Sequence, residues 1–257
     1  MTVRDDPPNP DPRFADLYAS LPEADDLWPW LDWCLNAGQP VLYLGVGAGR
    51  LAAPLHRAGI ELVGVDAHPG MLEHLERRIP GIQAHQALIE TLDLDRRYDL
   101  VIGPSSILTS DANLAPAVRH IRPGGRVGME LMNPNWLTST PHEGVRLKQR
   151  ADGSTALEVD YRLRDGSIVV QLVEGWRPGP RPENARARLA RFGLELLWVG
   201  PRPDAELDDS PTYYVLGGIP HPPGRDAGCL AASSAERGRR MAAIRGYERQ
   251  EPVDSLS

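Results

Sequence analysis

The chain has 257 residues, of which 41% are apolar and 25% are charged, so it is long enough for one large α/β domain with an inserted or appended element. Its formal net charge of −7 offers no basic surface to phosphate backbones, and we expect a small-molecule substrate and no nucleic-acid partner. The two cysteines, Cys34 and Cys229, are too few and too far apart for a zinc site or a disulfide framework, so no metal is expected.

The N-terminal segment, residues 1–12, is rich in proline and aspartate and is predicted to be flexible. It has no apolar stretch of signal-peptide length, and no part of the chain approaches about 18 consecutive apolar residues. We therefore expect a cytoplasmic protein without membrane association. Residues 13–37 carry apolar side chains at helical spacing, and the folded domain is expected to cover residues 13–219.

Short apolar strands alternate with helices in the next part of the chain. The predicted order is strand 41–45, helix 49–58, strand 61–65, helix 69–78, strands 82–86 and 98–102, helix 112–121 and strand 126–132. This alternation favours an α/β fold with a Rossmann-like, doubly wound and mostly parallel sheet.

The periodicity changes after residue 140. Two Asp-Gly turns, at 152–153 and 165–166, separate three segments of alternating and β-branched residues, which predicts an inserted three-stranded antiparallel meander within residues 140–178. A helix at 182–192 and strands at 194–199 and 212–218 follow. Residues 220–257 are expected to form a largely flexible tail with one possible helix at 234–248.

The first predicted strand runs into the glycine loop of VLYLGVGAGR, residues 41–50. Glycine lacks a Cβ and tolerates positive φ, so such a loop lets backbone N–H groups approach a ligand closely. A dinucleotide loop, G-x-G-x-x-G, needs glycine at position 50, which here is Arg50. The observed spacing is Gly45, Gly47 and Gly49, for which an ordinary tight turn remains the alternative explanation.

The next strand, ELVGVD, ends at Asp66, where a carboxylate can accept hydrogen bonds from both hydroxyls of a ribose. A helix N-cap is the alternative role. The glycine loop, Asp66, and the later segments AHPGML, YDLVIG and HIRPGGRV together resemble the class I S-adenosylmethionine-dependent methyltransferases of the small-molecule type, over about residues 38–132. The resemblance implies that S-adenosylmethionine is the cofactor and S-adenosylhomocysteine the product.

The resemblance also implies a set of cofactor-binding residues. The loop glycines would contact the methionine and ribose portions of the cofactor, Asp66 the ribose, and Ile89 the adenine. Tyr18 would cap the cofactor pocket, and Ser105, which follows the fourth strand, would also contact the cofactor. This chain departs from the family at Tyr43, where an acid that orients the cofactor's ammonium group is common, and at Leu88, where an acid often binds the adenine amino group. Both departures predict weaker cofactor binding.

Residues beyond the ends of strands four and five are the candidates for catalysis. Glu130 and Asn133 could hold or deprotonate an acceptor, and His142 could reach it from the loop before the meander. Structural roles, as a hydrogen-bonded acid or a surface histidine, are the alternatives. Three tryptophans, Trp28, Trp30 and Trp33, could dock a helix or line the acceptor pocket.

We therefore predict an enzyme that transfers a methyl group to an oxygen or nitrogen atom of a small molecule, in bacterial natural-product metabolism. The meander would serve as a lid or as a homodimer surface. One alternative is a related enzyme that binds S-adenosylmethionine but catalyses a cyclisation, elimination or rearrangement, which the changes at Tyr43 and Leu88 would favour. Another is a non-catalytic binding module.

Overall fold

The computed structural model describes residues 1–6, 8–139, 141–163 and 165–220. The predicted C-terminal tail and its helix at 234–248 lie outside the described residues, apart from Pro220. Within the described part of the chain, no helix combines the length and the apolar character that a membrane crossing requires.

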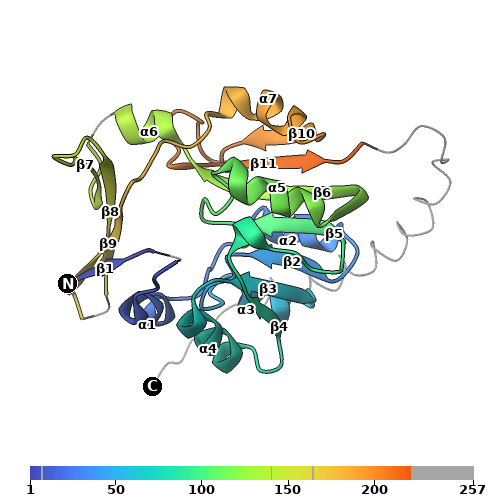
Figure 1. Cartoon of the computed structure of the whole chain (residues 1–257), viewed down its shortest axis with the longest axis horizontal. Coiled ribbons are helices and arrows are strands. Elements are labelled where there is room, and N and C mark those ends of the chain that lie inside the picture. The colour runs from blue at the N-terminus through green and yellow to red at the C-terminus, as the bar shows by residue number, and fades with distance from the viewer. Residues whose placement is uncertain (7, 140, 164, 221–257) are drawn as a thin grey trace, which may run out of the picture. The chain divides into compact units, whose positions relative to one another are not determined.

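The main sheet has seven strands in the order β10-β11-β6-β5-β2-β3-β4 (Figure 1). Strands β2, β3, β4, β5 and β6 run parallel, and β11 and β10 join antiparallel at one edge. Their bounds are β2 Val41–Leu44, β3 Leu62–Asp66, β4 Gln83–Gln86, β5 Tyr98–Gly103, β6 Ile121–Met132, β10 Glu195–Gly200 and β11 Thr212–Gly218. The predicted Rossmann-like, mostly parallel α/β fold is confirmed.

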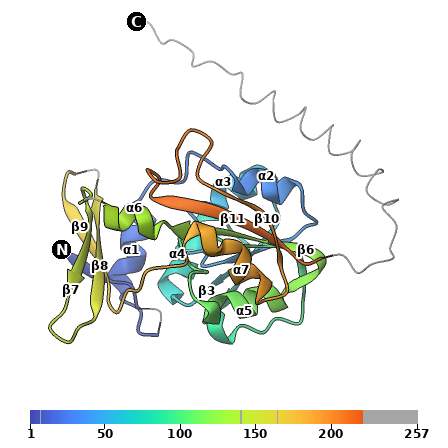
Figure 2. The same cartoon turned by 90° about the horizontal axis from the view of Figure 1, so that it is seen from above.

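Helices cover both faces of this sheet, and Figure 2 shows α2 and α3 on one side and α5 and α7 on the other. The strands supply both faces because successive side chains alternate: Val41 and Tyr43 pack with α2, whereas Leu42 and Leu44 pack with α5 and α7. The helices are α1 Pro12–Ser20, α2 Trp30–Leu35, α3 Ala52–Arg57, α4 Pro69–Arg78, α5 Asp111–Arg119, α6 Pro134–Ser139 and α7 Ala185–Ala190, with short 3₁₀ turns η1 Ile89–Thr91 and η2 Pro182–Asn184.

The tryptophan cluster mainly docks α2 against the sheet. Trp28 precedes the helix and packs edge to face on Trp198 and Tyr214, at ring-centroid distances of 5.8 and 5.1 Å. Trp33 lies over Gly128, where an added Cβ would approach its ring to 2.6 Å. Trp30, one of the three tryptophans that could line an acceptor pocket, also lines the cavity described below.

A second sheet has four strands in the order β1-β9-β8-β7, with bounds β1 Thr2–Arg4, β7 Val145–Gln149, β8 Thr155–Arg162 and β9 Ile168–Val173. The last three form the predicted antiparallel meander. The prediction of a flexible segment at residues 1–12 is wrong for its first half, because β1 pairs in parallel with β9 and buries Val3 completely. The segment also ends in the N-cap Asp11, whose side chain accepts from the Arg13 backbone N–H.

Candidate cofactor and substrate site

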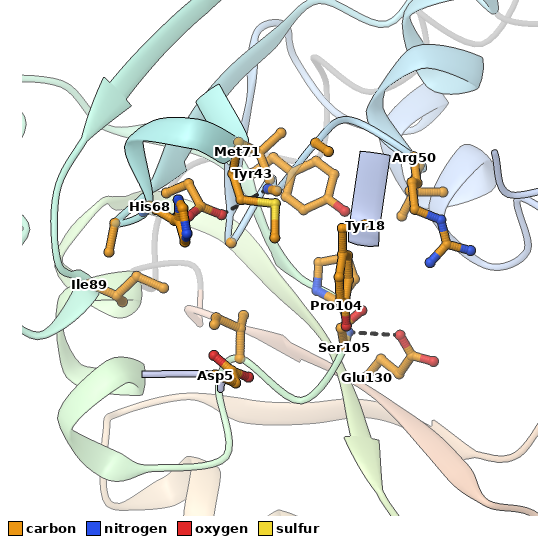
Figure 3. A pocket seen from close by; sticks show the side chains of 18 of the residues that line it. Asp5, Tyr18, Tyr43, Arg50, His68, Met71, Ile89, Pro104, Ser105 and Glu130 are labelled. Atoms are coloured by element: carbon orange, nitrogen blue, oxygen red, sulfur yellow. Dashed lines mark hydrogen bonds between the residues drawn. The ribbon is translucent and has the colours of Figure 1, made fainter. Parts of the chain in front are cut away.

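A cavity of about 360 Å³ lies over the carboxyl ends of the parallel strands. Its wall includes nine of the twelve residues that the sequence predicted for the site: Tyr18, Tyr43, Gly45, Gly47, Asp66, Leu88, Ile89, Ser105 and Glu130. Figure 3 shows part of this wall, with His68 and Ile89 on one side of the cavity and Arg50 and Glu130 on the other. Gly49, Asn133 and His142 do not line the cavity.

The glycine loop turns sharply because all three of its glycines have positive φ, at +68° for Gly45, +56° for Gly47 and +82° for Gly49. Gly47 borders the cavity, and a Cβ on it would meet only the Met71 Sδ, at 3.9 Å. Gly49 has a different role: a Cβ there would lie 2.8 Å from the Leu75 Cδ1. Gly49 therefore allows the loop to pack on α4, and it does not line the cavity.

Asp66 closes the loop from the end of β3. Its Oδ2 accepts from the Gly47 N–H at 2.8 Å, and its Oδ1 accepts from the His68 N–H at 2.8 Å. Burial raises the pKa of the Asp66 carboxyl group, while the backbone N–H groups of His68 and Gly47 oppose the rise. These two bonds fix the orientation of a carboxylate in the cavity wall and leave it lone pairs for a ligand's hydroxyl groups. The N-cap of α4 is His68, not Asp66.

The cavity wall also has an apolar part, which includes Met71, Leu88 and Ile89. Asn113 of α5, a helix that contacts the η1 turn, lines the same cavity. Its side-chain N–H donates to the Ile107 carbonyl oxygen at 2.7 Å, while its buried Oδ1 has no hydrogen-bond partner. The apolar residues at this end of the cavity suit a flat, apolar group.

Glu130 lies at the opposite end of the cavity. Its Oε2 accepts from the Ser105 backbone N–H at 2.9 Å, and its Oε1 accepts from the Tyr214 hydroxyl at 3.3 Å. Ser105 and Ser106 both have positive φ, +53° and +62°, a strained state for residues with a Cβ. Burial raises the pKa of Glu130, which the Ser105 N–H and the Tyr214 hydroxyl partly offset. Glu130 is thus a fixed carboxylate on the cavity wall.

Asn133, a predicted catalytic residue, has a fully buried side chain that is engaged in the fold. Its amide nitrogen donates to the carbonyl oxygens of Leu207 and Ser210, at 2.7 and 3.1 Å, and its Oδ1 accepts from the Asn135 N–H. Asn133 therefore ties the end of β6 to the loop before β11, and no polar atom of its side chain faces an acceptor.

The structure also places His142 away from the cavity. Its ring stacks on Trp136, with centroids 3.5 Å apart and planes at 14°, and its Nε2 lies 2.6 Å from the Trp136 carbonyl oxygen. In this arrangement His142, which was predicted to reach an acceptor, does not line the cavity. Its contacts make it part of the connection between α6 and β7.

The N-terminal segment supplies a wall that the sequence patterns missed. Asp5 and Asp6 follow β1 and line the cavity. Asp5 belongs to a chain of polar groups: Tyr18 and Tyr161 share a hydroxyl contact of 3.1 Å, the Tyr161 hydroxyl donates to the Gln171 Oε1 at 2.9 Å, and the Gln171 amide donates to the Asp5 Oδ2 at 3.0 Å. This chain connects α1, β8, β9 and the segment after β1 beside the cavity.

Burial raises the pKa of the Asp5 carboxyl group, and the hydrogen bond from Gln171 opposes the rise. The sequence signal that could have pointed to Asp5 is short: in Thr2–Arg4, one apolar residue, Val3, alternates with two polar ones, as in a strand with one buried face. Among the described residues, no three His, Cys, Asp or Glu side chains are grouped so that they could hold a metal ion.

Together, a glycine loop after a parallel strand, an acid after the adjacent strand and a cavity over the strand ends define an α/β protein that binds a nucleoside-containing ligand. Residues 41–125 match the family model described as a methyltransferase domain. Over these residues the chain matches a methyltransferase domain, which supports the resemblance to the class I S-adenosylmethionine-dependent methyltransferases. The predicted family is confirmed, and at the level of the family so is the predicted cofactor.

The chain is 37% identical over 103 residues to an uncharacterized methyltransferase of Mycobacterium tuberculosis, a match that covers 38% of this chain and 42% of that protein. It is 30% identical over 110 residues to the ubiquinone biosynthesis O-methyltransferase of Bradyrhizobium, with coverage of 40% and 43%. The match thus spans about two fifths of these curated relatives.

Solved structures share the fold at low sequence identity. The CcbJ methyltransferase from Streptomyces caelestis has a TM-score of 0.62 at 20% identity, covering 79% of this chain and 95% of its own. An amino pentose methyltransferase from Micromonospora echinaspora, involved in calicheamicin biosynthesis and solved with S-adenosylmethionine bound, has a TM-score of 0.51 at 18% identity, with coverage of 83% and 94%. These likenesses cover about four fifths of the chain, more than the family match at residues 41–125.

Proposed function

We propose that this protein transfers a methyl group from S-adenosylmethionine to an oxygen or nitrogen atom of a small molecule. The observation that carries the proposal is the Asp66 carboxylate, fixed by the Gly47 N–H at the mouth of a cavity over the strand ends. The cofactor fits this cavity because its ribose needs a hydrogen-bond acceptor and its adenine needs an apolar slot. Asp66 and the region of Leu88, Ile89 and Asn113 offer these.

When bound, S-adenosylmethionine supplies an activated methyl group on a sulfonium sulfur. The protein's own contribution is then mainly to align the acceptor with that methyl group and to exclude water. Tyr18 and Asp5 stand at the N-terminal wall, where they can close the cavity over an acceptor. Asp5 and Glu130 are carboxylates with raised pKa values, which makes either of them a better proton acceptor than an ordinary surface acid.

The test is binding and turnover with the purified full chain. Titration calorimetry should detect S-adenosylmethionine and S-adenosylhomocysteine, and mass spectrometry of candidate amines and alcohols should detect products heavier by one methyl group. Absence of binding to both nucleosides would contradict the proposal.

A second candidate function is a reaction without methyl transfer, such as a cyclisation, elimination or rearrangement with the cofactor bound. Tyr43 and Leu88 favour it, because both replace acids that the family commonly uses to hold the cofactor. Cofactor binding together with a product of unchanged mass would support this candidate. Binding of the acceptor without any product would instead favour the non-catalytic module.

The proposed setting is the cytoplasm of a bacterium and a natural-product pathway, which the calicheamicin-pathway structural relative supports. We also propose that the meander can form a homodimer surface. Its β7–β8 face carries ion pairs of Arg146 with Glu158 and Asp160 and of Lys148 with Glu158. Light scattering of the wild type and of Lys148→Glu tests the dimer, which the charge reversal should weaken if this face is buried.

A further inference from the structure

The order of the strands determines the direction in which the cofactor lies, given the proposed function. Asp66 ends β3, and Leu88 and Ile89 follow β4, so the nucleoside occupies the β3–β4 side of the cavity. The neighbours of β2 on its other side are β5 and then β6. The amino-acid end of the cofactor must therefore extend across β2 toward β5 and β6. Figure 3 shows Glu130 on that side, opposite His68 and Ile89.

That amino-acid end carries an α-ammonium group, which requires an acceptor and preferably a negative charge. Tyr43 of β2 cannot supply the charge, because burial, with the neighbouring Glu130 carboxylate as a further cause, raises the pKa of its phenol above the ordinary value. The side chain is 4% exposed and lines the cavity as a neutral group.

Glu130 shares a face of the sheet with Tyr43. Tyr43 pairs with Ile102 of β5, and Ile102 pairs with Gly128 of β6. Because side chains alternate along a strand, Glu130, two residues after Gly128, projects on the same face as Tyr43, about 10 Å across two strand spacings and about 7 Å farther along the strands. Its carboxylate therefore reaches the same end of the cavity from a different strand.

Glu130 also has bonding capacity in reserve. A carboxylate offers about four lone-pair sites, and the Ser105 N–H, the Tyr214 hydroxyl and the Thr212 side chain occupy three of them. Asp26 also lines the cavity, but it forms an ion pair with Arg202. Arg50 lies at this end with its Cζ 6.0 Å from the Tyr18 ring centroid, so the region offers both signs of charge, as an α-amino acid requires.

We propose that Glu130 binds the α-ammonium group of S-adenosylmethionine and so provides the negative charge that Tyr43 does not. Glu130 is then a cofactor-binding residue and not the base that deprotonates the acceptor. Asp5, half-buried on the cavity wall after β1, then remains as the candidate base.

The test combines a change in the ligand with a change in the protein. Calorimetry measures the binding of S-adenosylhomocysteine and of its deaminated analogue, which keeps the carboxylate but lacks the amino group. For the wild type, loss of the amino group should weaken binding about ten- to a hundredfold. Glu130→Gln should bind S-adenosylhomocysteine more weakly by a similar factor and should no longer distinguish the two ligands. The glutamine keeps an oxygen that can accept from the Ser105 N–H.

Glu90→Gln is the matched control, since Glu90 is an exposed acid that lines the opposite end of the cavity. It should discriminate the two ligands as the wild type does. In the Glu130→Gln background, Tyr43→Asp should restore part of the discrimination, because it returns a carboxylate to the same face.

The outcomes separate the two proposals. A wild type that binds neither S-adenosylmethionine nor S-adenosylhomocysteine would overturn the proposed function. A wild type that binds both, while Glu130→Gln still discriminates against the deaminated analogue by the full factor, would overturn only the role of Glu130. If Glu130→Gln proves unfolded by circular dichroism, equal binding of the two ligands to the wild type would still overturn that role.

Discussion

The two sheets contribute to the same cavity in different ways. The seven-stranded sheet presents Gly47, Asp66 and Glu130 from the ends of β2, β3 and β6, and backbone N–H groups hold both carboxylates. The four-stranded sheet positions Asp5 by the backbone pairing of a strand of only three residues, and it adds a side-chain network through Tyr161 and Gln171.

This difference indicates a division of labour. Backbone bonds at strand ends change little when side chains vary, which suits the constant demands of a cofactor. A side-chain network on an added sheet can change with the acceptor, because its residues are not required by the strand pairing itself. We therefore expect substitutions in the main sheet to reduce cofactor binding, and those in the second sheet to affect mainly the acceptor side.

The largest effect is expected for Asp66→Ala. The change removes the acceptor for the ribose hydroxyls together with the partner of the Gly47 N–H, so binding of S-adenosylhomocysteine should weaken about a hundredfold or more. Calorimetry measures the loss. The control is Glu61→Ala, which removes an exposed acid next to the opposite end of the same strand and should bind normally. Comparable losses in both variants would mean that Asp66 acts only through the fold.

The next largest effect is expected for Gly47→Ala. A Cβ at φ +56° is strained by about 1–2 kcal/mol, and it would project toward the space the ligand needs. Gly59→Ala is the control, because Gly59 has φ +84° and open space around it. Both variants should lose similar thermal stability, but only Gly47→Ala should lose binding of S-adenosylhomocysteine, by about tenfold or more. Equal binding by both would contradict a close approach at Gly47.

A third substitution, Val3→Asp, tests the second sheet. Val3 is completely buried, and a charge there should release β1 from β9, since an unpaired buried charge is costly. Hydrogen exchange measured by mass spectrometry should increase in β9, while binding of S-adenosylhomocysteine changes less than about threefold. Thr2→Asp places the same charge on the exposed side of the strand and should leave exchange unchanged. A loss of cofactor binding as large as that of Gly47→Ala would contradict the division of labour.

The smallest effect is expected for Gln171→Leu, which removes the link between Tyr161 and Asp5 and should cost about 1–3 kcal/mol of unfolding free energy. It should also make stability more sensitive to pH. Asp5 already has a raised pKa, so the free energy of unfolding falls as pH rises from the ordinary carboxyl pKa through the raised folded-state value. Without the Gln171 bond the pKa rises further, and the loss should be larger at pH 8 than at pH 5.

Denaturant unfolding at the two pH values measures this difference. Gln149→Leu is the control, because Gln149 is an exposed residue of the same sheet that bonds to Thr155. If the cost of Gln171→Leu were the same at both pH values, Asp5 would not be coupled to Gln171.

The parts of the site that depend on neighbours in the chain could be predicted from the sequence. The glycine loop and Asp66 were predictable because each lies at the end of an apolar strand, and parallel strands bring such ends to one edge of the sheet. Asn133 illustrates the opposite case. Its position after β6 resembles that of a catalytic residue, but its orientation depends on the carbonyl oxygens of Leu207 and Ser210, far along the chain.

The sequence by itself determined the Rossmann-like sheet, the antiparallel meander and the cofactor loop, because periodicity and glycine spacing are local properties of a chain. Only the tertiary structure decided which carboxylates face the cavity. It brought Asp5 to the site through the pairing of Thr2–Arg4 with β9, more than 160 residues away and too short for a pattern to reveal. It also placed Glu130 on the same face as Tyr43, through the register of three strands whose order no single segment encodes.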